Sequence, residues 1–227
     1  MENYKSKEWL EQRMSEFDNG DWDSAIEYFD DYIRKNPNSY EAYMARGELY
    51  VEEEEYNYAL NDFNKAIKIA PNEPELYLSR GTTYAYIPNN LDNALNDFCI
   101  AIRLNSNFTA AYSNRATIYL RKGELQKAIS DCTKAIELSP KEIEPYFNRG
   151  LSYVNNGEYE KALVDYNKVI QLDPENVEAY AKRGLINSEL GNKHAAINDF
   201  EKFIRLDPEN KNVELVQDAL DDLLNSD

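Results

Sequence analysis

The stretch YFNRGLSYVNNGEYEKALVDYNKVIQLDP, residues 146–174, contains the pattern that decides the fold. The same pattern recurs along the chain and can be aligned on one tyrosine. Successive copies of this aligned tyrosine lie 34, 35, 34 and 34 residues apart, at Tyr43, Tyr77, Tyr112, Tyr146 and Tyr180. A fixed period in this range is typical of a solenoid, in which each unit buries its apolar face by stacking on its neighbours. The sequence therefore predicts a repeat protein that presents a long surface rather than a closed pocket.

Each repeat is predicted to contain two helices with small residues where they meet. Apolar residues at helical spacing, as in Ala128–Ile136, give the second helix one buried stripe. A small residue follows each aligned tyrosine by four places, at Gly47, Gly81, Ala116, Gly150 and Gly184. The second helix carries a mostly aromatic place at Phe63, Phe98, Cys132, Tyr166 and Phe200. Because small residues let two helices approach closely, the pattern predicts tightly packed helix pairs.

The repeats resemble a known family. YMARGELY at 43–50 and YALNDFNKAIKIAP at 58–71 are similar to the tetratricopeptide repeat, and the resemblance extends over about residues 6–210. It implies an all-α, right-handed superhelical solenoid of antiparallel helix pairs. It also implies an inner, concave face, built mostly from the first helix of each pair, that commonly holds peptide ligands.

We predict a single solenoid over residues 1–227. Its repeats are expected at 6–39, 40–73, 74–108, 109–142, 143–176 and 177–210, followed by a capping helix at 211–227. Repeat one departs from the others, because Arg13 and Glu16 stand where they carry a small residue and usually a tyrosine. A polar outer face suits a terminal repeat. For the last helix, the alternative is an amphipathic segment that docks on a partner, including a second copy of this chain.

Repeat three carries one extra residue and a proline, Pro88, between its two helices. We expect the turn to absorb this residue, because shifting either helix would misplace its buried stripe.

Composition and charge bound the class of function. The net charge is −17, so a nucleic-acid partner is not expected, because phosphate binding needs a basic face. The absence of a long apolar run and of a signal-peptide core predicts a cytoplasmic protein without a membrane association. His194, Cys99 and Cys132 lack metal-type spacing, and no catalytic motif is present. We therefore expect no enzyme activity, no metal and no cofactor.

A second regularity is an arginine directly before each small residue. These arginines are Arg46, Arg80, Arg115, Arg149 and Arg183. The same repeats carry an aspartate before the aromatic place, at Asp62, Asp97, Asp131, Asp165 and Asp199. An anionic ligand is one interpretation of the arginines. The favoured interpretation is a structural Arg–Asp pair that joins helices, because the matching acid is always there.

The resemblance also indicates which residues line the groove. It assigns the inner face to the place two residues before each aligned tyrosine and to the places one, two, five, eight and nine residues after it. Residues 74–142 carry the only positive balance of the chain, since repeat four has six Lys or Arg and four acids. The predicted peptide-binding residues are Thr82, Asn114, Thr117, Arg121, Phe147, Asn148, Leu151 and Lys182.

The sequence thus predicts a non-enzymatic scaffold that binds a peptide segment of a protein partner in this groove, with preference for an acidic or C-terminal peptide. The alternative is a self-associating structural protein that uses the terminal helix or an exposed end as its contact.

Overall fold

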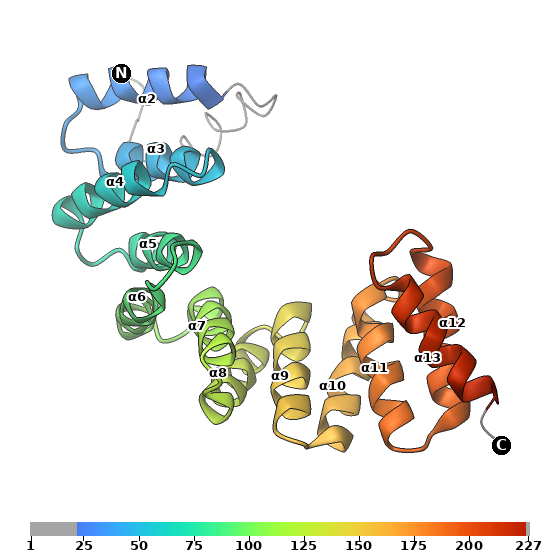
Figure 1. Ribbon diagram of the computed structural model, residues 1–227. Coiled ribbons are helices and arrows are strands. Elements are labelled where there is room, and N and C mark those ends of the chain that lie inside the picture. Colours follow the sequence, from blue (N-terminus) through green and yellow to red (C-terminus); the bar gives the residue numbers. More distant parts are fainter. Residues whose placement is uncertain (1–21, 226–227) are drawn as a thin grey trace. The chain divides into compact units, whose positions relative to one another are not determined.

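A computed structural model describes residues 22–225, and this part of the chain is all-α, without strands (Figure 1). Its helices are α2 (Trp22–Lys35), α3 (Tyr40–Glu52), α4 (Tyr56–Ile69), α5 (Pro74–Tyr86), α6 (Leu91–Leu104), α7 (Thr109–Arg121), α8 (Leu125–Leu138), α9 (Ile143–Asn155), α10 (Tyr159–Leu172), α11 (Val177–Glu189), α12 (Lys193–Leu206) and α13 (Val213–Asn225). The opening part of repeat one, with Arg13 and Glu16, lies outside the described residues. The predicted all-α fold is confirmed.

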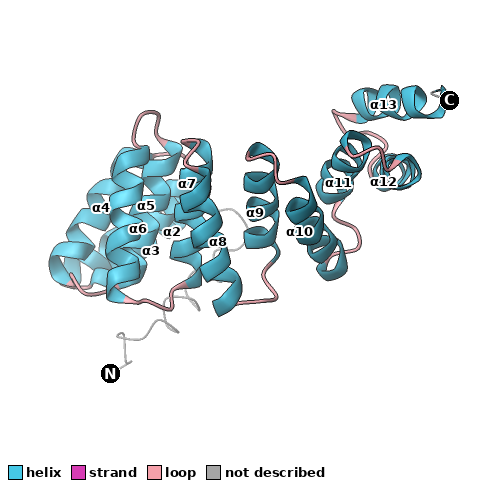
Figure 2. Cartoon of the chain, turned by 90° about the horizontal axis from the view of Figure 1, so that it is seen from below, coloured by secondary structure: helices cyan, strands magenta, loops and turns pink. Residues whose placement is uncertain are grey.

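The chain divides into two compact units, residues 1–118 and 119–227, with the boundary near the end of α7. In the first unit, α2 packs on α3, α4 lies between α3 and α5, α5 packs on α6, and α3 also contacts α5. In the second, each helix from α8 to α13 contacts the next one along the chain. Short turns join the helices (Figure 2). The handedness of the superhelix, the six repeats and the single solenoid stay predictions.

Turn and capping residues explain where the helices begin and end. The side chain of Asn176 accepts a hydrogen bond from the backbone N–H of Ala179 at 3.0 Å, which caps the first turn of α11. After α9, Gly157 has φ +75°, a left-handed conformation that glycine adopts at little cost. After α3, the corresponding residue is Glu54 at φ 58°. A side chain in that conformation costs roughly 1–2 kcal/mol, so this acidic turn is locally strained.

The extra residue of repeat three lies in the turn, as predicted. Helix α5 ends at Tyr86 and α6 begins at Leu91, so neither helix runs through Pro88. Asn89 takes the left-handed conformation at φ 63°. The buried faces of both helices keep their register as a result.

The closest packing within a helix pair joins the glycine of the first helix to the ring of the second. The rings of Phe63, Phe98, Tyr166 and Phe200 are 0–1% exposed. A Cβ atom placed on Gly184 would lie 2.6 Å from Cε1 of Phe200, and one on Gly47 would lie 2.8 Å from Cε1 of Phe63. Real Cβ atoms do not come so close to other heavy atoms, so only glycine fits at these two places.

The aligned tyrosine connects consecutive repeats. The hydroxyl of Tyr77 donates a hydrogen bond to the carbonyl oxygen of Pro71 at 3.0 Å. Tyr146 and Tyr180 make the same bond to the prolines six residues before them, each at 3.2 Å. The tyrosine and the closing proline of the repeat therefore act together to fix the turn between repeats.

Helix α13 covers the end of the second unit with one face. Val216 and Leu220 are buried and belong to a cluster with Ala196, Phe200 and Phe203 of α12. Burial of this kind is what a capping helix needs, although the capping role itself stays a prediction. Helix α13 also exposes Leu215 and, one turn after the buried Leu220, Leu224.

We predict that Gly184→Ala lowers the free energy of unfolding by about 1–2 kcal/mol, as measured by urea denaturation. Overpacking against Phe200 costs typically about 1–3 kcal/mol, which outweighs the gain of up to about 1 kcal/mol in helix propensity. The matched background is Phe200→Leu, which lacks the ring atom that Cβ would meet. In that background Gly184→Ala should be neutral or stabilising. An equal loss in both backgrounds would show that the contact with the ring is not the cause.

Candidate functional site

The predicted peptide-binding residues lie on first helices, as expected from their places in the repeat. Thr82 is on α5, Asn114 and Thr117 are on α7, and Arg121 ends α7. Arg121 belongs to the second unit, as do Phe147, Asn148 and Leu151 on α9 and Lys182 on α11. We call these residues the first-helix face.

In the first unit the structure brings two of the predicted residues together. The side-chain amide of Asn114 donates a hydrogen bond to the hydroxyl oxygen of Thr82 at 3.0 Å, which links α7 to α5. Both side chains are half-buried. One amide hydrogen of Asn114 is used in this bond, and its other hydrogen and its carbonyl oxygen suit an extended peptide backbone. The hydroxyl of Thr117 donates to the carbonyl oxygen of Ser113 on the same helix at 3.1 Å.

A further pair extends this face toward the start of the chain. The hydroxyl of Ser79 on α5 donates to a carboxylate oxygen of Glu48 on α3 at 3.3 Å. Polar side chains thus connect α3 to α5 and α5 to α7 along one face of the first unit. Such bonds hold the side chains in fixed positions before a ligand arrives.

In the second unit an aromatic side chain forms part of the same face. The ring of Phe147 packs edge-to-face on the buried ring of Tyr166, with centroids 5.4 Å apart and an interplanar angle of 79°. This packing fixes the orientation of Phe147, which stays half-buried. The side-chain amide of Asn148 donates to the carboxylate of Glu144 at 3.4 Å. Leu151 and Lys182 are half-buried on α9 and α11.

The predicted Arg–Asp pair forms in every repeat in which the arginine and the aspartate belong to the same unit. Arg46, Arg80, Arg149 and Arg183 each donate two hydrogen bonds to the aspartate of their own repeat, at 2.6–2.9 Å. The four aspartates are 1–3% exposed. The structural interpretation is therefore confirmed for these pairs. The fifth pair, Arg115 with Asp131, joins residues of different units and stays a prediction.

Sequence reasoning missed a third contact of these arginines. The remaining guanidinium nitrogen reaches the second helix of the preceding repeat, at the residue 16 places earlier. Arg80 donates to Asn64 at 2.5 Å, Arg149 donates to Thr133 at 3.1 Å, and Arg183 donates to Asn167 at 2.6 Å. Arg46 donates to Asp30 in the same way. The acceptors differ in type, so the repeat pattern gave no signal for them.

The electrostatics of these pairs agree with a structural role. The hydrogen bonds to Asp165 raise the pKa of Arg149 above its ordinary value. The arginine therefore stays charged at neutral pH. Nearby, burial raises the pKa of Cys132 to about 12, so its thiol is not a nucleophile at neutral pH. This burial bears out the interpretation of Cys132 as a core residue.

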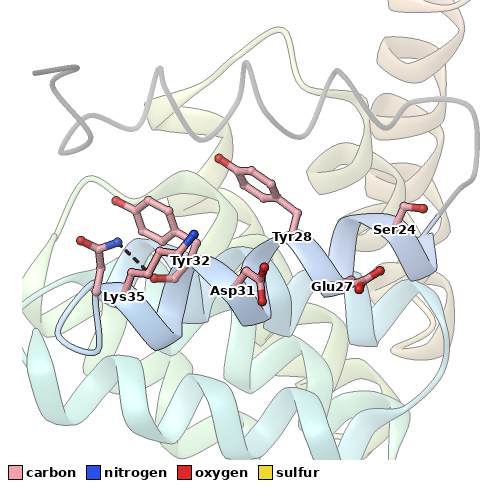
Figure 3. A pocket seen from close by; sticks show the side chains of 7 residues that line it. Ser24, Glu27, Tyr28, Asp31, Tyr32 and Lys35 are labelled. Carbon is pink, nitrogen blue, oxygen red and sulfur yellow. Dashed lines mark hydrogen bonds between the residues drawn. The ribbon is translucent and has the colours of Figure 1, made fainter.

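A depression also runs along the exposed side of α2 (Figure 3). Its lining includes Ser24, Glu27, Tyr28, Asp31 and Tyr32, all on this helix. The amide of Asn36 donates to the backbone carbonyl of Tyr32 at 3.1 Å. Side chains from a single helix fan out along its length, as the figure shows, and do not converge on a point. The described residues of this depression therefore do not form the converging groups of a ligand pocket.

Residues 22–225 contain neither a group of three His, Cys, Asp or Glu side chains placed to hold a metal ion nor a helix long and apolar enough to cross a membrane.

The sequence matches models of one family along most of its length. Residues 12–74, 109–142, 132–164 and 151–221 each match a model described as tetratricopeptide repeat. The chain belongs to the tetratricopeptide repeat family. The resemblance inferred from the aligned tyrosines is thereby confirmed, and the family places the chain among protein-interaction scaffolds. No significant match was found among curated proteins.

Solved structures show the same fold. MamA is 27% identical to this chain, with a TM-score of 0.66 over 74% of this chain and 91% of that one. YrrB, described as a tetratricopeptide protein with an unusual peptide-binding site, is 22% identical, with a TM-score of 0.69 over 86% and 98%. PilW, described as a type IV pilus biogenesis factor, is 16% identical, with a TM-score of 0.82 over 92% and 96%. The last two likenesses concern the fold alone.

We predict that Arg149→Ala lowers the free energy of unfolding by roughly 3 kcal/mol, because it leaves the buried carboxylate of Asp165 without its partner. Lys134, whose side chain is 42% exposed, provides the control, and Lys134→Ala should change stability by less than about 0.5 kcal/mol. In the double variant Arg149→Met with Asp165→Leu, the loss of unfolding free energy should be smaller than the sum of the losses measured for Arg149→Met and Asp165→Leu alone. Additive losses in thermal or urea unfolding would contradict a coupled pair.

Proposed function

We propose that this tetratricopeptide protein is a non-enzymatic scaffold that binds a peptide segment of a protein partner on its first-helix face. The observation that carries the proposal is the hydrogen bond between Asn114 and Thr82, which holds an amide in place on that face. An extended peptide exposes a backbone N–H and C=O at every residue except proline, and a fixed amide can pair with both kinds of group.

The second unit supports the proposal with apolar contact. Phe147 is held against Tyr166, and Leu151 lies one helical turn further along the same helix. Half-buried apolar side chains next to an amide can bind alternate side chains of a peptide while the amide binds its backbone. The proposed contacts in this unit are therefore Phe147, Asn148 and Leu151, with Lys182 on α11.

Charge favours an acidic or C-terminal peptide. Arg121 and Lys182 supply positive charge on first helices of a chain whose net charge is −17. Because the rest of the chain repels anions, a carboxylate is best placed next to these two side chains. The preference rests on long-range attraction and should weaken as salt is added.

We predict that Asn114→Ala and Asn148→Ala each weaken peptide binding by about 1–3 kcal/mol, the cost of a lost hydrogen bond in a buried contact. Short random peptides displayed on phage are first selected on the full chain. The best one is then titrated by calorimetry against both variants. Lys134→Ala, on a second helix, is the control and should bind like the wild type. Equal affinities for all three variants would place the site elsewhere, most plausibly on α13.

Self-association is the second candidate, and it is favoured by the exposure of Leu215 and Leu224, which are 69% and 56% exposed on α13. Under our proposal the chain keeps its mass of 26.4 kDa at all concentrations in light scattering. A mass that rises with concentration, and returns to this value in Leu215→Ser with Leu224→Ser, would favour self-association instead.

A further inference from the structure

Repeat six, residues 177–210, breaks the repeat pattern at two places that face each other. Three residues after the small residue, repeats two to five carry a tyrosine, whereas repeat six has Asn187. The tyrosines at this place are Tyr50, Tyr84, Tyr119 and Tyr153. Directly before the buried alanine of the second helix, repeats two, four and five carry Tyr58, Lys127 and Lys161. Repeat six has Ala195 at this second place, so both of its side chains are short.

In repeats two, four and five these two side chains fill the space between them. The rings of Tyr50 and Tyr58 have centroids 5.4 Å apart. The ammonium nitrogen of Lys161 lies 5.4 Å from the ring centroid of Tyr153. In repeat two, Arg46 also takes part, because its guanidinium carbon lies 5.8 Å from the ring of Tyr43 and 5.9 Å from the ring of Tyr50. The arginine is thus held between two tyrosine rings.

Repeat six keeps one of these rings and lacks the other. The guanidinium carbon of Arg183 lies 5.6 Å from the ring of the aligned Tyr180. Asn187 stands where the second ring would be. A notch of about 350 Å³ is found here, lined by Leu163, Asn167, Arg183, Asn187, Ala195, Asn198 and Asp199. We call it the repeat-six notch, and α10, α11 and α12 form its walls. Both shortened residues and the arginine line it, so the break in the pattern and the notch coincide.

Side chains that line the notch are held by hydrogen bonds, and the charge of Arg183 is balanced by that of Asp199. Asn187 is only 7% exposed, and its amide donates to the carboxylate of Asp199 at 3.2 Å. Its carbonyl oxygen accepts a hydrogen bond from Asn192 at 3.3 Å. Arg183 already pairs with Asp199 and Asn167, so its charge is compensated. A compensated guanidinium attracts an anion weakly but still offers its face to an aromatic ring.

We propose that the repeat-six notch binds a tyrosine side chain of a partner protein, whose ring takes the place of the missing repeat tyrosine beside Arg183. The exposed amides of Asn167 and Asn198 at the rim can pair with the backbone next to that tyrosine. The notch is lined by Arg183 and Asn187, which stand three and seven residues after the aligned Tyr180. Neither place belongs to the first-helix face. The notch is therefore a second site, independent of the proposed peptide-binding face.

N-acetyl-tyrosinamide tests the proposal, titrated into the full chain while side-chain and backbone amides are followed by NMR. We expect saturable shifts centred on Asn187 and Asn198, with a dissociation constant on the order of 1 mM, as befits a small ligand. Asn187→Tyr restores the repeat tyrosine and fills the notch, so it should weaken binding at least about tenfold. The control Asn96→Tyr makes the same change at an exposed place on α6 and should leave binding unchanged.

A second variant and two further probes make the test decisive. Ala195→Lys restores the lysine of repeats four and five and should also weaken binding, independently of whether Asn187→Tyr folds. Wild-type affinity in both variants would overturn the proposal, as would the absence of saturable shifts. Free p-cresol should bind no more tightly than N-acetyl-tyrosinamide. Tighter binding of p-cresol would show that the notch selects a free phenol and not the tyrosine side chain of a partner, and would overturn the proposal. Shifts with acetate and not with the phenols would show an anion site and overturn the proposal.

Discussion

The contact between an aromatic ring and a residue without a side chain is the constraint on which the helix pairs of repeats two, three, five and six depend. Gly184 lets Phe200 lie so close that a single added carbon would not fit. This contact fixes the rotation of the second helix, and the residue before the ring, Asp199, is buried with it. A buried carboxylate needs a positive partner, and the residue before the glycine, Arg183, supplies it. Glycine, ring, acid and base therefore form one unit of packing.

This coupling explains why so much of the fold could be predicted from the sequence. The period, the glycines and the paired Arg and Asp recur together, so alignment of one tyrosine predicts the helices, their buried faces and the ion pairs. Other features depend on which surfaces meet and do not recur. The acceptor of the third arginine bond is Asn64 in one repeat and Thr133 in another. The bond from Asn114 to Thr82 joins the same repeat places as the bond from Ser79 to Glu48, but the residue types differ.

The division between recurring and varying places also bears on recognition. Places that recur are used in packing within and between repeats, so they can give the protein its shape but not its choice of partner. Selectivity for a partner must come from places that vary between repeats. On the first-helix side, the place two residues after the aligned tyrosine varies from Ser79 to Asn148 to Lys182. The repeat-six notch exists because Asn187 departs from the tyrosine of the other repeats. The alignment of repeats shows this departure, but only the structure shows that Ala195 faces it.

The third arginine contact gives the array a direction. Each arginine reaches back to the second helix of the repeat before it, as Arg46 does to Asp30 and Arg183 does to Asn167. Loss of a repeat at the C-terminal end would leave a polar side chain such as Asn167 to be solvated by water. Loss of the repeat that holds Asp30 would instead leave the guanidinium of Arg46 with one carboxylate fewer. As far as these bonds are concerned, removal of a repeat therefore disturbs the remaining array less at the C-terminal side than at the N-terminal side.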